Sequence, residues 1–88
     1  MTFYRKKSLV IEAWRVNDNP APQWVLDSPR LKPLENGYEI KIEEFSNRIF
    51  GTILVGNGDW IVKGIRGELY PCSHEIFQET YEPVEKGI

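Results

Sequence analysis

The sequence predicts an α+β fold that is mainly β: a small, bent and mostly antiparallel sheet of five or six strands with two short helices. Several short segments are rich in β-branched and aromatic residues and alternate between apolar and polar positions, which is typical of half-buried strands. Glycine, proline and asparagine separate these segments at short intervals, as turn residues do. Most connections are too short for a parallel crossover, which needs a dozen or more residues, so the strands should run antiparallel.

The first expected elements are a strand and a short helix. Residues 8–16 carry apolar groups at both odd and even positions, which favours a strand that is central in its sheet or covered on both faces. Asn19 can cap a helix that has Pro20 at its first position. We therefore expect a short helix over about residues 23–26.

Two strands are expected in the middle of the chain. Pro33 predicts an irregular stretch before the turn at residues 36–37. Apolar and charged residues alternate in residues 38–43, which is the pattern of a half-buried strand. Residues 49–55 predict the next strand, in which Gly51 indicates a bulge or a bend.

The next segment predicts a hairpin. The glycine-rich residues 56–59 should form a tight hairpin turn, followed by a strand at residues 60–65. A two-residue turn at residues 66–67 leads back into a strand at residues 68–70. Pro71 should end that strand or lie at a sheet edge, because proline lacks the N–H that a central strand needs.

A helix and a last strand close the predicted fold. Ser73 can cap a helix over about residues 74–79, and residues 80–84 favour a strand. No linker and no internal repeat interrupts the pattern, so we expect residues 1–88 to form a single domain.

Composition limits the classes of function. The net charge is −2 and the isoelectric point is about 5.4, whereas binding to a nucleic-acid backbone favours a basic surface, so we do not expect a nucleic-acid partner. The single cysteine cannot form an intrachain disulfide. The apolar runs are far shorter than the roughly 20 residues of a membrane span. We expect a soluble, cytoplasmic protein without a membrane partner.

Aromatic residues are abundant, with three Trp, four Tyr and four Phe. Each buries roughly 150–250 Å², which together is more than a compact core of this size readily hides. We therefore expect one or two of them to be exposed or to lie in a subunit contact, which leaves a homo-oligomer open.

Few residues in the sequence suggest catalysis or metal binding. Cys72 and His74 are two residues apart, so their side chains can share a face of a strand end, as a nucleophile and its base would. No residue is placed to orient the imidazole, and cysteine is often simply buried. We therefore predict a non-enzyme without catalytic residues, and a Cys72-dependent enzyme is a remote alternative. One cysteine and one histidine are too few for a zinc site, so no metal or cofactor is expected.

A small-ligand site is the nearer alternative. Lys63 and Arg66 could grip a phosphate, and Trp60 and Tyr70, with Phe77, could offer rings on which a base stacks. These residues would bind a nucleotide-type ligand at a subunit interface. The competing interpretation is that the aromatic residues pack the core and that Arg66 is a solvated hairpin tip.

Three pieces of the chain resemble a family of small uncharacterised proteins common in tailed-phage and prophage genomes. The most specific has the pattern GDWI…G…GE.YPC. The pieces are residues 3–7 with 10–13, residues 58–64 with 66–72, and residues 76–77 with 80–84. Residues 17–56 match nothing in the family, and Ser73, His74 and Glu75 replace a more usual Lys-Pro-Asp. The resemblance implies a phage or prophage origin and action in the host cytoplasm, but it implies no activity.

These observations favour a small accessory protein that binds a host or phage protein without catalysing a reaction. The phage-like pieces, the excess of aromatic residues and the weak catalytic signals all support this interpretation.

Overall fold

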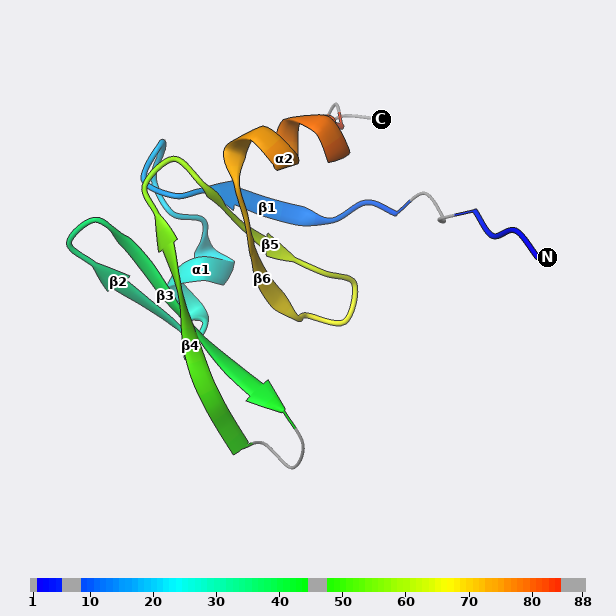
Figure 1. Cartoon of the computed structure of the whole chain (residues 1–88). Coiled ribbons are helices and arrows are strands. Elements are labelled where there is room, and N and C mark those ends of the chain that lie inside the picture. Colours follow the sequence, from blue (N-terminus) through cyan, green and yellow to red (C-terminus); the bar gives the residue numbers. More distant parts are fainter. Residues whose placement is uncertain (1, 6–8, 45–47, 85–88) are drawn as a thin grey trace.

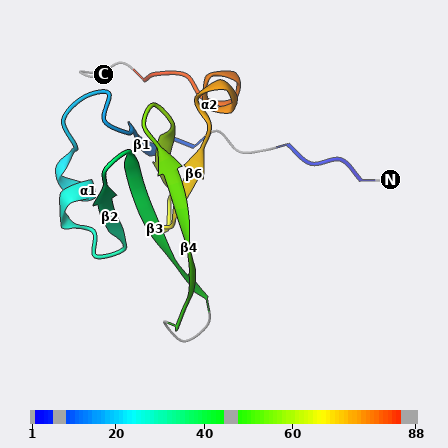
Figure 2. The ribbon, with the colours of Figure 1, turned by 60° about the vertical axis from the view of Figure 1, so that its left-hand side comes forward.

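The computed structural model of this chain describes residues 2–5, 9–44 and 48–84, and within them it has six strands and two short helices (Figure 1). Along the chain the elements are β1 (Glu12–Arg15), α1 (Gln23–Asp27), β2 (Leu31–Leu34), β3 (Gly37–Glu44), β4 (Arg48–Gly56), β5 (Trp60–Lys63), β6 (Leu69–Cys72) and α2 (His74–Thr80). Figure 2 shows the two helices on opposite sides of the molecule, with α1 beside β2 and α2 above β6.

The mainly β, antiparallel character of the fold is confirmed, but the expectation of one sheet is wrong. The six described strands form two antiparallel sheets of three, with the orders β1-β5-β6 (the first sheet) and β2-β3-β4 (the second sheet). The chain crosses between the sheets at residues 57–59, where the sequence predicted a hairpin turn. A glycine-rich turn has the same local signature whether it joins strands of one sheet or of two, so the sequence pattern alone does not separate these cases.

Backbone hydrogen bonds hold this crossing against the end of β1. The N–H of Val16 donates to the carbonyl oxygen of Asp59 over 2.7 Å, and the N–H of Gly58 donates to the carbonyl oxygen of Val16 over 2.9 Å. Gly58 has φ +87°, a value that side chains rarely allow, so another residue would be strained at this position. These bonds hold the start of β5 beside the end of β1, and the long chain segment between the two strands contains α1 and the second sheet.

The two sheets share one core. Buried apolar side chains from both sheets and from the segments that join them form a single cluster: Trp14, Val16, Val25, Leu31, Tyr38, Ile40, Val55, Ile61 and Leu69. The rings of Trp14 and Tyr38 meet edge to face across the sheets, with centroids 5.1 Å apart. Such a pair contributes about 0.5–1.5 kcal/mol beyond the area that it buries.

The register of the first sheet separates its two faces. Ile61 pairs with Trp14, and both belong to the core, so this is the inner face. Neighbouring residues of a strand point to opposite faces, so Trp60 and Val62 lie on the outer face, where Val62 pairs with Tyr70. Val62 is fully buried but lies outside the core cluster. The outer face is therefore covered as well.

Several predicted elements differ in their bounds or caps. β1 is shorter than the predicted strand and lies at an edge; Ser8, which the prediction included, is outside the described residues. The predicted Asn19 cap is wrong, because Pro22 occupies the N-cap position of α1 and no described side chain caps this helix. Asn19 instead accepts a hydrogen bond from the indole of Trp14.

The prolines and the C-terminal residues bring three further results. Pro33 lies inside β2, so the predicted irregular stretch is wrong; β2 is an edge strand, where a missing N–H is tolerated. Pro71 lies in the edge strand β6, as one of the two alternatives predicted. The predicted last strand is wrong, since residues 81–84 form neither strand nor helix.

The predictions for α2 and for β4 are confirmed. Ser73 is the N-cap of α2, and its hydroxyl accepts a hydrogen bond from the N–H of Ile76. In the pairing of β3 with β4 the register shifts at Ile42, opposite Gly51, which is the bulge that this glycine indicated.

Candidate functional site

An aromatic stack joins α2 to the outer face of the first sheet. The ring of Phe77 lies parallel to that of Trp60, with centroids 3.7 Å apart and planes 5° apart. The imidazole of His74 is also parallel to Trp60, at 6.4 Å, and Tyr81 lies 4.8 Å from Phe77. We call Trp60, His74, Phe77 and Tyr81 the α2 stack. One face of Trp60 is thus used within the protein to fasten α2.

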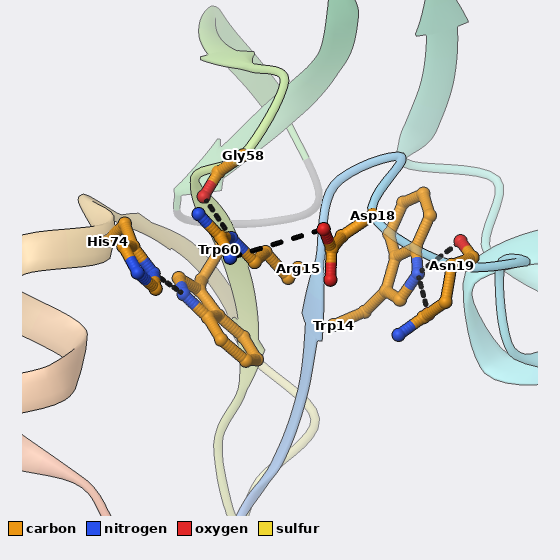
Figure 3. A network of polar contacts seen from close by, with 7 residues as sticks. All are labelled: Trp14, Arg15, Asp18, Asn19, Gly58, Trp60 and His74. Atoms are coloured by element: carbon orange, nitrogen blue, oxygen red, sulfur yellow. Dashed lines mark hydrogen bonds and ion pairs between the residues drawn. The ribbon is translucent and has the colours of Figure 1, made fainter.

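Polar contacts fix the imidazole within this stack (Figure 3). The indole Nε1–H of Trp60 donates to Nδ1 of His74 over 3.1 Å. Because Nδ1 accepts this bond, the proton of the neutral ring lies on Nε2. The backbone N–H of His74 donates to Oδ1 of Asp59 over 3.0 Å. The nearby carboxylate therefore holds the start of α2, and it does not orient the imidazole as a catalytic triad would.

Arg15 and Asp18 support the same corner of the molecule (Figure 3). Nε of Arg15 donates to the carbonyl oxygen of Gly58 over 2.8 Å, and its Nη1 lies 4.0 Å from Oδ1 of Asp18. The guanidinium thus holds the turn that carries the chain from β4 into β5. Its role in this arrangement is structural.

The environment of Cys72 works against reactivity. Burial raises the pKa of its half-buried thiol, and the negative charge of Asp59 raises this pKa further. Reactive cysteines have a lowered pKa, because the thiolate is the nucleophile. No hydrogen bond joins Cys72 to His74 among the residues that the structure describes.

The four residues predicted to bind a ligand do not lie together in the structure. Trp60 and Tyr70 lie on the outer face, whereas Lys63, three positions after Trp60 on β5, points to the inner face. Arg66 lies in the turn after β5, and its backbone N–H donates to Oε1 of Glu68. The structure therefore brings Trp60 and Tyr70 to one face and does not bring Lys63 or Arg66 to them.

Tyr70 contacts the end of the α2 stack. Its hydroxyl oxygen lies 3.2 Å from that of Tyr81, within hydrogen-bond distance. This hydrogen bond, together with burial, raises the pKa of Tyr70 to about 12. The phenol of Tyr70 therefore stays neutral near pH 10.0, where an unperturbed tyrosine ionises.

Lys63 lines an open depression on the inner side. Its Nζ lies 5.8 Å from the ring centroid of Trp24 and 3.8 Å from Oε1 of Glu12. The depression has a volume of about 340 Å³ and lies between α1, the loop after α1 and the β5–β6 hairpin. Arg30, Asp27 and Leu69 also line it.

Trp24 and Arg30 are site residues that sequence reasoning missed. Trp24 was predicted to lie in a helix and Arg30 in the connection after it. Nothing in their spacing links them to Lys63, which lies far along the sequence on β5. The fold places α1 near the end of β5, where Nζ of Lys63 lies 5.8 Å from the ring centroid of Trp24. No local signal in the sequence reports this contact.

Comparisons with known proteins give no relative. No protein family, no curated protein and no solved structure matches this chain. Within the described ranges, no helix is long and apolar enough to cross a membrane. In the same part of the chain, no group of three or more His, Cys, Asp or Glu residues gathers as a metal site requires.

Proposed function

We propose that this chain is a phage- or prophage-encoded accessory protein that acts in the host cytoplasm as a non-enzymatic binding module. The three sequence pieces that resemble a phage protein family support this origin. The observation that carries the binding role is the exposed apolar segment before β1, residues 2–5 and 9–11, which we call the N-terminal segment.

The N-terminal segment exposes large apolar side chains. Phe3 is 85% exposed, Tyr4 92% and Val10 74%, and Figure 1 shows the segment leading away from the two sheets. Phe3 and Tyr4 are neighbours in the sequence, and exposed apolar side chains that gather in this way commonly mark an interaction site. The sequence predicted one or two exposed aromatic side chains; among the described residues three are exposed, namely Phe3, Tyr4 and Tyr70.

The position of the segment at a sheet edge supports pairing with another protein. β1 is an edge strand, and its pairing with β5 ends where Glu12 meets Lys63. β5 gives way to a turn at Gly64, so residues 9–11 run past its end. Extended segments of this kind bind by adding a strand to a sheet edge of the partner, with alternate side chains entering its pockets.

The charge of the segment suggests the chemistry of the partner. Arg5 follows Phe3 and Tyr4 in the sequence and is exposed, and the sequence continues with Lys6 and Lys7. Opposite charges on the partner would steer the encounter and fix the register. We therefore expect a host or phage protein with an acidic border around an exposed strand edge.

Capture from a host lysate tests the proposal. The bait is the wild-type protein, the variant Phe3→Ser/Tyr4→Ser, or a matched control, Leu54→Ser/Ile65→Ser, which removes two apolar side chains exposed elsewhere. We expect the wild type and the control to capture the same protein, and the N-terminal variant to bind it at least about tenfold more weakly. Repeated capture of no partner, or equal capture by the N-terminal variant, would contradict the proposal.

Light scattering tests whether the partner is a second copy of this chain. If the N-terminal segments pair with one another, the mass of the wild type exceeds that of a monomer and the Phe3→Ser/Tyr4→Ser variant is monomeric. A monomeric wild type at high protein concentration would exclude self-association and leave a different protein as the partner.

A further inference from the structure

The depression beside Lys63 combines features that suit a small aromatic anion. Its volume of about 340 Å³ lies at the lower end of the range of roughly 300–1,000 Å³ found for small-molecule sites. It is lined by one indole and two cations, from Trp24, Arg30 and Lys63. We propose that this depression binds a nucleoside monophosphate, with the base on Trp24 and the phosphate between Lys63 and Arg30.

The two cations have only weak partners within the protein. The ion pair of Lys63 with Glu12 is 3.8 Å long and both side chains are partly exposed, so it contributes little and is easily exchanged. Nε of Arg30 donates to the carbonyl oxygen of Lys41 over 3.3 Å, which orients the guanidinium. Among the described residues, no hydrogen bond engages the Nη atoms of Arg30. These atoms can therefore grip a phosphate in the two-pronged manner of guanidinium groups.

Trp24 can stack with a base without unfolding the site. Its indole is partly buried and packs against the core, which holds the ring in place. The ammonium of Lys63 lies over the ring, so the cation and the stacking surface are already adjacent. A phosphate that draws the flexible Lys63 side chain aside exposes the ring face to the base. Stacking on aromatic side chains is a common way of binding bases.

The acidic residues nearby set the preferred number of phosphates. Asp27 lines the depression and Glu12 lies beside Lys63. Their negative charges oppose a long polyphosphate chain, because like charges at short distance repel. A monophosphate therefore suits the depression better than a triphosphate. This inference is independent of the N-terminal segment and does not rest on the proposed protein partner.

Titration calorimetry with AMP tests the inference, with adenosine, inorganic phosphate and ATP as comparison ligands. We expect AMP to bind more tightly than any of these three, because only AMP combines the base with a single phosphate. Lys63→Gln and Arg30→Gln should each weaken AMP binding about tenfold, since each removes a charge-assisted contact. Trp24→Leu should weaken AMP to the level of inorganic phosphate.

Two controls make the result specific. Lys32→Gln removes an exposed lysine of β2 that does not line the depression, and it should leave AMP binding unchanged. Thermal melting of Lys63→Gln should match the wild type, so that lost binding reports the site and not the fold. Absence of AMP binding at millimolar concentration would overturn the inference. Equal loss in Lys32→Gln, or loss in Arg66→Gln with Lys63→Gln unaffected, would overturn it too.

Discussion

The two faces of the first sheet use their chemically versatile side chains in different ways. On the outer face, Trp60 stacks on Phe77 of α2 and its indole donates a hydrogen bond to the imidazole of His74, while Tyr70 contacts Tyr81 at the end of this helix. On the inner face, Lys63 lies at the end of the sheet. Its ammonium is near the ring of Trp24, and both residues line the open depression. The outer face is closed by packing, and the inner edge remains open.

This difference shows that residue type alone does not locate a binding site. The aromatic residues with the clearest sequence signature serve to fasten a helix of seven residues, which could not be stable alone. The open depression is built partly from residues without a sequence signature. If packing closes the outer face, variants there should lose stability and its titratable groups should react slowly.

The largest expected effect comes from removing the centre of the α2 stack. Trp60→Ala removes the contacts with Phe77 and the hydrogen bond to His74, and should cost about 3 kcal/mol of unfolding free energy, at the low end for such truncations because Trp60 is only half-buried. For a chain of this size this lowers the melting temperature by roughly 12 °C or more. Urea denaturation measures the loss.

Trp24→Ala is the matched control on the inner side. Trp24 is half-buried and packs against the core, but no described aromatic ring stacks on it as Phe77 stacks on Trp60, so its loss should cost about half as much. If Trp24→Ala destabilises the protein as much as Trp60→Ala, the two faces do not differ in the way described, and the depression is part of the packed structure.

The next effect concerns the cap of α2. Ser73→Ala removes the hydroxyl that accepts a hydrogen bond from the N–H of Ile76, and should cost about 1 kcal/mol. Ser73→Asp keeps an acceptor at the same position and should retain most of the stability. Equal losses in both variants would mean that the α2 stack holds the helix without help from its cap.

The contrast between the helices also explains what the sequence could predict. α2 has its signals within a few residues, namely the Ser73 cap and Glu75 in the first turn, and the helix was predicted almost to the residue. The residues of α1 were also predicted closely, but its predicted Asn19 cap was wrong, because Asn19 bonds to Trp14 instead. Local patterns thus predict elements that local contacts stabilise, and they fail where tertiary contacts compete.

The same limit applies to the sheets and the site. The alternation in β3 predicted its strand and its buried face, because one side of this strand faces the core. The division into two sheets depends on the bonds between Val16 and the turn at residues 57–59, which join distant parts of the chain. The contact of Trp24 with Lys63 is equally distant, so only the folded structure reveals it.

A smaller effect should appear at alkaline pH. The hydrogen bond with Tyr81 raises the pKa of Tyr70 from 10.0 to about 12, so the folded state favours the neutral phenol. This contribution to stability is fully present below about pH 10 and is lost as the pH rises toward about 12. Tyr70 is 36% exposed, so solvent weakens the effect. Ultraviolet titration of the phenolate measures the pKa, and urea denaturation at several pH values measures the stability.

Tyr81→Phe is the control for this alkaline effect. It removes the hydroxyl partner and keeps the ring that packs on Phe77, so the pKa of Tyr70 should fall toward 10.0 with little change in stability at neutral pH. An unchanged pKa of Tyr70 in this variant would show that burial, and not the hydrogen bond, causes the shift.

The reactivity of Cys72 is the most subtle test of the outer face. Because burial and the charge of Asp59 both raise the pKa of the thiol, iodoacetamide at mildly alkaline pH should alkylate the folded protein more slowly than the urea-unfolded chain. Asp59→Asn removes the negative charge and keeps an oxygen that can accept from the N–H of His74, so it should modestly speed alkylation without unfolding α2. Faster alkylation of the folded wild type than of the unfolded chain would mean that the fold activates this thiol. The outer face would then be a reactive surface, and the contrast between the two faces would be lost.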